Sequence, residues 1–150
     1  MNERVRVVMD DTEVAAMLHA CRKVQIATIN RDGTPHLVTM FYGVRDGRIA
    51  FWTYRASQKA RNLVRDPRVT CLVEAGDDYF ALRGVQVNGV VECIEDAEGV
   101  LDIGRLIAAR LPGLPAEVLE EYVVQAARKR VAFLVAPRRV VSWDHRRLLT

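Results

Sequence analysis

Two Asp-Gly pairs determine how the first third of this chain can fold. Asp32-Gly33 and Asp46-Gly47 each separate runs that are rich in β-branched and aromatic residues. Such a pair favours the tight turn of a β-hairpin, because both residue types tolerate a positive φ. The sequence therefore predicts three consecutive antiparallel strands, over residues 24–30, 35–44 and 48–54.

After these strands the pattern alternates between helices and strands. A polar helix is expected over residues 57–66, followed by strands over residues 68–75 and 79–95. Within the second of these strands, Gly84 and Asn88-Gly89 indicate a bulge or a sharp bend.

Two amphipathic helices come next, joined by the turn sequence Pro112–Pro115. Their apolar residues recur at helical spacing from Val100 to Leu111 and from Val118 to Ala126. A last strand is expected over residues 131–143, and a short capped helix precedes the first strand. About six strands and four helices, mainly antiparallel, indicate an α+β fold built around a small barrel.

The composition fits one domain and excludes several classes of protein. The 150 residues are 50% hydrophobic with both signs of charge interspersed, which excludes a disordered chain. No apolar run approaches the roughly 20 residues of a membrane span, and Met1–Val8 lacks a secretion signal. The three cysteines and three histidines are scattered without metal-ligand spacing. We therefore expect a reduced, cytoplasmic protein without a metal and without a membrane partner.

The basic charge balance raises the question of nucleic-acid binding. The chain has 22 basic and 19 acidic residues, and only three of the basic residues are lysines (Lys23, Lys59 and Lys129). The acidic residues are distributed throughout, and no recognition motif or aromatic-interleaved basic run is present. We therefore expect no nucleic-acid partner.

The segment from Phe51 to Leu63 carries the clearest signal of chemistry. A strand ends at Tyr54 and a helix begins near Ser57, so free helix N–H groups lie beside a capping hydroxyl. Lys59 falls in the first turn, where a cation opposes the helix dipole. A bound phosphate resolves that conflict, because it accepts from the helix end, Ser57 and Lys59. The alternative is a solvated basic helix with an ordinary serine cap.

Four segments occur in a characteristic order. They read ATxxxDGxPH at Ala27–His36, FWTY…SQKxRNLxRDPRV at Phe51–Val69, LRGVxVxG at Leu82–Gly89 and RVxSWDHR at Arg139–Arg146. Together they resemble the pyridoxamine 5′-phosphate oxidase-like split-barrel superfamily. The closer resemblance is to its actinobacterial branch that uses the deazaflavin coenzyme F420. The likeness covers essentially the whole chain, and Thr-x-x-x-Ser-x-Lys is its most specific part.

The resemblance implies a fold and a cofactor site. The fold is a six-stranded antiparallel split β-barrel with flanking helices, which pairs into a homodimer with a cofactor site at each end of the interface. The residues that the resemblance places at the phosphate are Thr53, Ser57 and Lys59, with Arg55 and Gln58 beside them. The residues that it places along the ring are Val38, Thr39 and Tyr42, with Tyr79 and Trp143 contributed by the second subunit.

Two departures from the flavin-using oxidases bear on the cofactor. The strand Leu37–Gly43 lacks the Arg and the Lys that those enzymes carry there, and Ser142–Arg147 replaces their C-terminal Arg-x-His-x-Arg signature. These departures argue against pyridoxamine phosphate oxidation. They favour F420 as the cofactor, with FMN as the alternative.

The anionic character of F420 supports the same preference for F420 over FMN. F420 carries a phosphodiester and a tail of glutamates, so positive charge beyond one phosphate pocket helps to hold it. Sources of such charge are Arg55, Arg61, Arg128, Lys129, Arg130, Arg138 and Arg139. The alternative for the run 128–130 is a solvated helix end, where cations are favoured by the dipole.

The expected activity is that of an oxidoreductase that transfers hydride from the reduced deazaflavin to a small electron-poor acceptor. Tyr42, Tyr79 and His145 are side chains that could donate a proton, and no catalytic residue is assigned. The alternative from another class is a non-catalytic protein that stores or shields a flavin or a tetrapyrrole.

Overall fold

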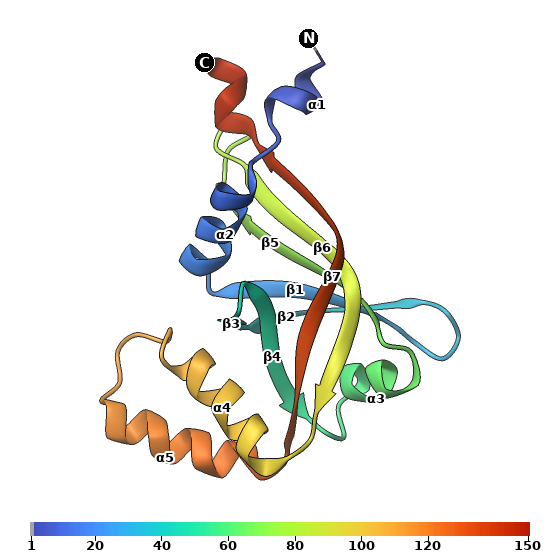
Figure 1. Cartoon of the computed structure of the whole chain (residues 1–150), viewed down its shortest axis with the longest axis vertical. Coiled ribbons are helices and arrows are strands. Elements are labelled where there is room, and N and C mark those ends of the chain that lie inside the picture. The colour runs from blue at the N-terminus through green and yellow to red at the C-terminus, as the bar shows by residue number, and fades with distance from the viewer. Residues whose placement is uncertain (1) are drawn as a thin grey trace.

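The computed structural model describes residues 2–150 as one curled antiparallel sheet with helices around it (Figure 1). The strands are β1 (Lys23–Ile29), β2 (Pro35–Phe41), β3 (Gly43–Arg45), β4 (Arg48–Tyr54), β5 (Arg68–Ala75), β6 (Arg83–Ile94) and β7 (Arg130–Asp144). The helices are α1 (Glu3–Arg6), α2 (Asp11–Ala20), α3 (Gln58–Arg65), α4 (Ala97–Ala108), α5 (Ala116–Ala127) and the 3₁₀ helix η1 (His145–Leu149). The predicted antiparallel α+β architecture is confirmed. The N- and C-terminal elements α1 and η1 were not predicted.

The two edges of the sheet are neighbours in sequence. The strand order is β2-β1-β5-β6-β7-β4-β3, so β2 and β3 lie at opposite edges although only Tyr42 separates them. The sheet must therefore curl until its edges approach each other. The prediction of one strand over residues 35–44 was wrong at this point, and the sheet has seven strands instead of the expected six.

Tyr42 is held in the core by a complete set of polar contacts. Its side chain is 1% exposed, and its hydroxyl donates to the Leu18 carbonyl oxygen at 2.6 Å. The Arg110 guanidinium lies over the Tyr42 ring, 4.5 Å from its centroid, and donates to the Tyr42 carbonyl oxygen at 3.0 Å. Arg110 also donates to Leu18 at 3.0 Å, so one side chain fastens the corner to the end of α2.

The core consists of two apolar clusters on either side of β4 and the first half of β7. Phe51 and Phe133 point into the curled sheet, with ring centroids 5.4 Å apart. Trp52 points the other way and packs against α4 and α5. Because β4 is covered on both faces, its position is fixed more firmly than that of an edge strand. The C-terminal end of β4 is therefore a rigid support for the start of α3.

The predicted irregularity in β6 is a β-bulge. The register between β6 and β7 shifts between Asn88 and Gly89, as the sequence predicted. A side chain at position 89 would overlap the Ala136 carbonyl oxygen, so only glycine permits this approach of the two backbones. The strand begins at Arg83 and not at Tyr79, because residues 76–82 form a loop.

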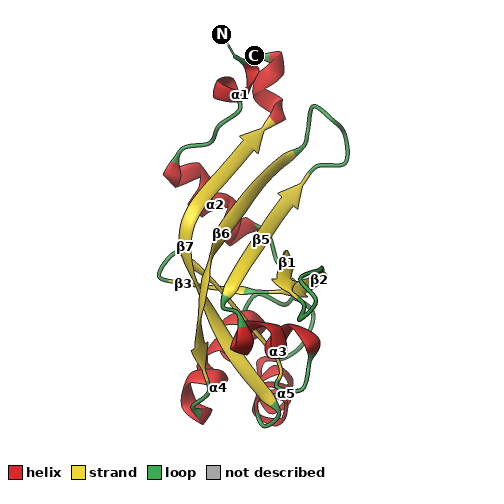
Figure 2. Cartoon of the chain, turned by 90° about the vertical axis from the view of Figure 1, so that its right-hand side faces the viewer, coloured by secondary structure: helices red, strands yellow, loops and turns green. Residues whose placement is uncertain are grey.

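The outer side of β5, β6 and the second half of β7 carries none of the described helices, whereas α4 and α5 cover the outer side of β4 and the first half of β7. Figure 2 shows β5, β6 and β7 side by side, and none of the helices within residues 2–150 lies over the face turned to the viewer. Large apolar side chains are exposed on the outer side of the sheet, among them Leu37, Phe41 and Val141. No helix among these residues is long and apolar enough to cross a membrane.

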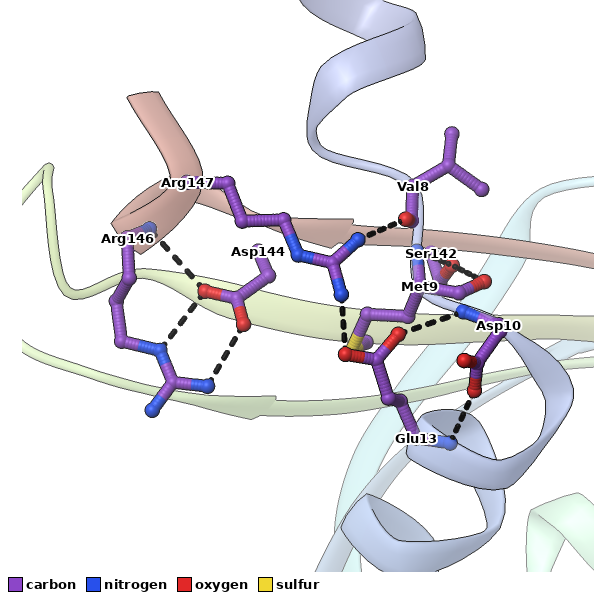
Figure 3. Close-up of polar contacts among 8 residues, drawn as sticks. All are labelled: Val8, Met9, Asp10, Glu13, Ser142, Asp144, Arg146 and Arg147. Atoms are coloured by element: carbon purple, nitrogen blue, oxygen red, sulfur yellow. Dashed lines mark hydrogen bonds and ion pairs between the residues drawn. The ribbon is translucent and has the colours of Figure 1, made fainter. Parts of the chain in front are cut away.

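The two ends of the chain are fastened together beside α2 (Figure 3). The Arg147 guanidinium donates to the Val8 carbonyl oxygen and pairs with the Glu13 carboxylate. The Met9 N–H donates to the Ser142 hydroxyl oxygen at 3.0 Å. These contacts position the N-terminal segment before α2 begins.

Asp144 is the buried acid of this cluster, and it predicts how stability depends on pH. It accepts from Arg146 Nε at 2.9 Å and from Arg146 Nη2 at 2.7 Å, which lowers its pKa below the ordinary 3.8. A carboxyl whose pKa is lowered by folding stabilises the protein above its unfolded pKa and loses that contribution as the pH falls through the folded pKa. Asp144→Asn should therefore destabilise by about 1–3 kcal/mol at neutral pH.

The deficit of Asp144→Asn should shrink as the pH falls below about 4, because the natural carboxyl is then also becoming neutral. Chemical denaturation at a series of pH values measures this. Asp77→Asn, at an exposed position, is the control and should match the natural chain at each pH. A deficit that stays constant with pH would contradict a charge-dependent role for Asp144.

Candidate functional site

The junction between β4 and α3 brings two hydroxyl groups together. Ser57 is the N-cap of α3, and its Oγ accepts from the Ala60 N–H at 3.2 Å. Thr53, at the end of β4, donates its hydroxyl to Ser57 Oγ at 3.2 Å. Thr53 is only 3% exposed, so it holds the Ser57 hydroxyl from the buried side of the junction. The hydroxyl hydrogen of Ser57 remains free for an outside acceptor.

Lys59 lies half-buried in the first turn of α3. That turn holds no acidic residue, so nothing local offsets the lysine against the helix dipole. Burial lowers the pKa of Lys59, and the nearby Arg130 guanidinium lowers it further. Neither Lys59 nor Arg130 forms an ion pair within residues 2–150. Lys59 in the first turn of α3 and Arg130 opposite the end of β4 therefore both lack a counter-charge from the described chain.

Arg130 reaches this place through the register of the sheet. It pairs with Tyr54 across β4 and β7, and its guanidinium lies 4.3 Å from the Tyr54 ring centroid and 4.9 Å from that of Trp52. The sequence placed Arg130 only in a general basic run. Which basic residue faces the β4 end depends on strand register, and no local pattern encodes that register.

An apolar hollow of about 270 Å³ opens beside Arg130. One wall is the end of β2, including the exposed Thr39, and another is Trp52 with residues of α4 and α5, including Tyr122. Thr39, expected to lie along a cofactor ring, therefore lines the hollow that Arg130 also lines. Val38 points to the opposite face of β2, because successive side chains of a strand alternate.

Arg55 and Gln58 lie at the same junction with their side chains already engaged. Arg55 donates from Nη1 to the Arg128 carbonyl oxygen at 3.0 Å, and Gln58 donates from Nε2 to Asn62 Oδ1 at 2.8 Å. Both residues are exposed, so each keeps further donors for a ligand. The structure thus gathers five of the predicted residues at one junction: Thr53, Arg55, Ser57, Gln58 and Lys59.

Comparison with protein families identifies this architecture. A family model described as pyridoxamine 5′-phosphate oxidase matches residues 10–144. The chain belongs to this family. A comparison with curated proteins found no match.

Solved structures agree with the family assignment. The conserved hypothetical protein Rv2991 from Mycobacterium tuberculosis is 41% identical over 100% of this chain and 94% of that one, with a TM-score of 0.91. A protein described as an F420 reductase is 24% identical over 83% of this chain and 93% of that one, with a TM-score of 0.61. The heme storage protein HutZ from Vibrio cholerae is 17% identical over 88% of this chain and 94% of that one, with a TM-score of 0.70. At such low identity, the last two show the shared fold alone.

Tyr42 does not face the hollow in this member of the pyridoxamine 5′-phosphate oxidase family. The structure places it in the core, where its hydroxyl is bonded to Leu18 and burial raises its pKa. The suggestion that the Tyr42 hydroxyl donates a proton to a substrate does not fit this buried position. The resemblance placed Tyr42 on one strand with Thr39, but the chain turns a corner at Tyr42, and its side chain lies in the core.

Tyr79 and Trp143 lie at the other end of the sheet. Trp143 is close to the C-terminal end of β7, whereas Arg130 begins that 15-residue strand. Tyr79 is exposed, and its carbonyl oxygen lies 2.8 Å from His145 Nδ1. A single copy of the chain therefore does not bring these residues to α3. Among residues 2–150, no cluster of His, Cys, Asp and Glu suited to a metal is present.

Trp143 has a packing partner within the chain. It pairs with Gly84 across β6 and β7, and a side chain at position 84 would overlap the indole ring. Two of the family motifs, LRGV and SWDH, therefore meet in one contact on the outer face of the sheet.

Sequence reasoning did not single out Asn62, which fixes α3 against the sheet. Its side chain is fully buried and donates to Thr28 Oγ1 and Asn30 Oδ1, both at 3.0 Å. Its carbonyl oxygen accepts from Gln58 Nε2, so every strong hydrogen-bonding group of the amide is used. A buried amide whose hydrogen-bonding groups are all paired fixes the position and rotation of α3 relative to β1.

Removal of the Asn62 amide should destabilise the protein. Asn62→Ala leaves the partners of the amide without a bond and opens a small cavity, which should lower the free energy of unfolding by about 2–4 kcal/mol. Arg61→Ala, on the exposed side of the same helix, should change it by less than about 0.5 kcal/mol. Denaturant unfolding of both variants measures the difference. Equal effects of the two substitutions would contradict the anchoring role of Asn62.

Proposed function

We propose that this protein is an oxidoreductase that binds the deazaflavin coenzyme F420 and transfers hydride to a small electron-poor organic acceptor. The observation that carries the proposal is the uncompensated Lys59 beside the Ser57 hydroxyl at the start of α3. F420, when bound, supplies the hydride chemistry. The chain itself would hold the phosphate and orient the ring.

The donor set fits a phosphate ester. The free Ser57 hydroxyl, the Lys59 ammonium and the N–H groups at the end of α3 are all hydrogen-bond donors, and their combined charge is positive. In the absence of a counter-ion, burial disfavours the charged form of Lys59, as its lowered pKa indicates. An anion at this place would reverse that effect and raise the pKa of Lys59.

The neighbouring hollow suits the apolar part of such a ligand. Thr39 offers a hydroxyl on an otherwise largely apolar wall, and Trp52 offers an aromatic side chain. The backbone of β2, including that of Val38, is the further group proposed along the ring. Arg55 and Arg61 are exposed near α3, where they would attract the glutamate tail of F420. FMN lacks such a tail, and it is the competing cofactor.

Substitution of Lys59 should weaken binding of the phosphate-bearing cofactor. Lys59→Met keeps an unbranched apolar stem and removes the charge, which should weaken F420 binding by about 10–100-fold, as expected for lost hydrogen bonds to a charged group. Arg4→Met, with the same change of charge on the exposed helix α1 at the other end of the molecule, is the control and should weaken binding by less than about threefold. Fluorescence titration with F420, and separately with FMN, measures both effects.

The possible results separate the competing functions. Tight FMN binding without F420 binding would replace the deazaflavin with a flavin in this proposal. Binding of neither would overturn the enzyme proposal. Tight F420 binding without hydride transfer to any quinone, dye or biliverdin-type acceptor would favour a storage protein.

We further propose that the protein acts as a homodimer through the part of the outer sheet face that α4 and α5 leave uncovered. Exposed apolar residues on that face, including Leu37, Phe41 and Val141, would be covered by a second copy. Pairing would also allow Tyr79 and Trp143 of one copy to approach the α3 junction of the other. No single copy can complete a site that needs both groups of residues.

A charge placed on this face should separate the copies. Val141→Glu should convert a dimer into a monomer, because an unpaired carboxylate is costly to bury in an interface. Val118→Glu, on exposed α5, should leave the dimer intact. Light scattering coupled to size-exclusion chromatography measures the mass of each variant. A monomeric natural chain at micromolar concentration would overturn the dimer proposal.

A further inference from the structure

The apolar hollow beside Trp52 has two walls that come from distant parts of the chain. One wall is the end of β2, with Met40 and Phe41. The other is the end of α4, with Ile107 and Ala108. Because the hollow measures only about 270 Å³, a small displacement of either wall changes which ring systems it can hold.

Arg110 follows the end of α4 and fastens it to the corner at which β2 ends. Its Nη1 donates to the Tyr42 carbonyl oxygen at 3.0 Å, and its guanidinium lies 4.5 Å from the Tyr42 ring centroid. Its Nη2 donates to three carbonyl oxygens at the end of α2, those of Leu18 at 3.0 Å, His19 at 3.1 Å and Cys21. The donors of a guanidinium have a fixed planar geometry, so these acceptors together hold it in one orientation.

Gly43 brings α4 close to the same corner. A Cβ at position 43 would lie 3.1 Å from Leu106 Cβ and 3.4 Å from the Ile107 backbone nitrogen. These distances are shorter than ordinary van der Waals contact, so α4 touches the corner directly. The hydrogen bonds of Arg110 and the missing side chain of Gly43 therefore fix the same distance, the one between the end of α4 and the end of β2.

The middle of α4 is fixed separately, against the aromatic side of the hollow. A side chain at position 104 would overlap the Trp52 ring, so Gly104 allows the helix to pack on the indole. Trp52 thus fixes one part of the helix, and the contact between Arg110 and the Tyr42 corner spans the two walls.

We propose that Arg110 is a positioning residue that sets the width of the hollow, and that it thereby makes the site prefer three-ring cofactors over smaller phosphate-bearing rings. This inference rests on the proposed function, because it assumes that the cofactor ring occupies the hollow. Arg110 acts through its neighbours, since Ala108 and Leu111 on either side of it line the hollow. Without its hydrogen bonds the end of α4 can move away from β2, and a flat ring then loses contact with one of the two walls.

The preference for ring size is measured with ligands that share a phosphate ester. F420 and FMN carry a three-ring system, whereas pyridoxine 5′-phosphate carries a single ring. The dissociation constant of pyridoxine 5′-phosphate is divided by that of the three-ring cofactor that binds the natural chain. This ratio isolates the ring, since damage to the phosphate contacts weakens both ligands. Fluorescence titration gives the ratio for each variant, and thermal unfolding shows that the variant is folded at the temperature of the titration.

Three variants alter the distance between the walls. Arg110→Met removes every hydrogen bond of the guanidinium and should reduce the ratio by at least about tenfold, while binding of pyridoxine 5′-phosphate changes by less than about twofold. Arg110→Lys keeps the charge without the planar donors and should lose part of the preference. Gly43→Ala pushes α4 from the corner with Arg110 intact and should reduce the ratio by about threefold or more.

Arg147→Met is the matched control for loss of stability. Arg147 also fastens separate segments, because it donates to the Val8 carbonyl oxygen and pairs with Glu13, but it lies with the chain termini at the far end of the molecule from the hollow (Figures 1 and 3). Arg147→Met should lower the Tm by several degrees, as Arg110→Lys should, and should leave the ratio within about twofold of the natural value.

The outcomes distinguish this inference from the proposed function. If Lys59→Met weakens both ligands while folded Arg110→Met keeps the natural ratio, the phosphate site stands and the role of Arg110 is overturned. A loss of preference in Arg147→Met as large as that in Arg110→Met also overturns it. If Arg110→Met does not fold, an unchanged ratio in Arg110→Lys overturns the role, and a reduced ratio supports it. If the natural chain binds neither F420 nor FMN, the proposed function and this inference both fail.

Discussion

The corner at Tyr42 is the constraint on which the rest of the structure depends. One residue joins the two edges of a seven-stranded sheet, so the sheet can close only if that residue turns inward and stays there. The hydroxyl contact with Leu18 and the overlying Arg110 guanidinium stabilise that turn. Closure brings the end of β2 toward β4 and the helices α4 and α5, and the hollow beside Arg130 lies between these elements.

The positive charge of the candidate site lowers the stability of α3. An acidic residue in the first turn of α3 would stabilise the helix, yet the chain places Lys59 there and Arg130 beside it. The rigid packing around the site compensates for this loss of stability. The buried amide of Asn62 fixes the helix against β1, and the doubly covered β4 fixes Thr53 and Trp52. Groups that repel each other are thereby held in place by neighbours that do not titrate.

Local signals in the sequence predicted much of the fold. The Asp-Gly turns, the Ser57 cap, the two amphipathic helices and the bulge at Asn88-Gly89 all arise from residues close together in the chain. The same is true of the gathering of Ser57 and Lys59 at one helix end.

Features that depend on pairing between distant segments were not predictable in this way. The corner at Tyr42 exists because β3 pairs with β4 and not with β1, which residues 35–44 do not encode. Arg130 meets Trp52 only through the register of β7 on β4, and Asn62 meets Thr28 only after α3 has packed on β1. A one-dimensional pattern carries the identity of these residues but not their neighbours.

The contact between Gly84 and Trp143 has a consequence for how relatives of this protein can diverge. The indole occupies the space that any larger residue at position 84 would need, so the two positions cannot change independently. A relative with alanine or a larger residue at position 84 must carry a smaller or differently oriented side chain at position 143. We therefore expect positions 84 and 143 to change together among relatives, although they lie far apart in the chain. Relatives that keep glycine at position 84 are those that can keep an indole on the outer face of the sheet.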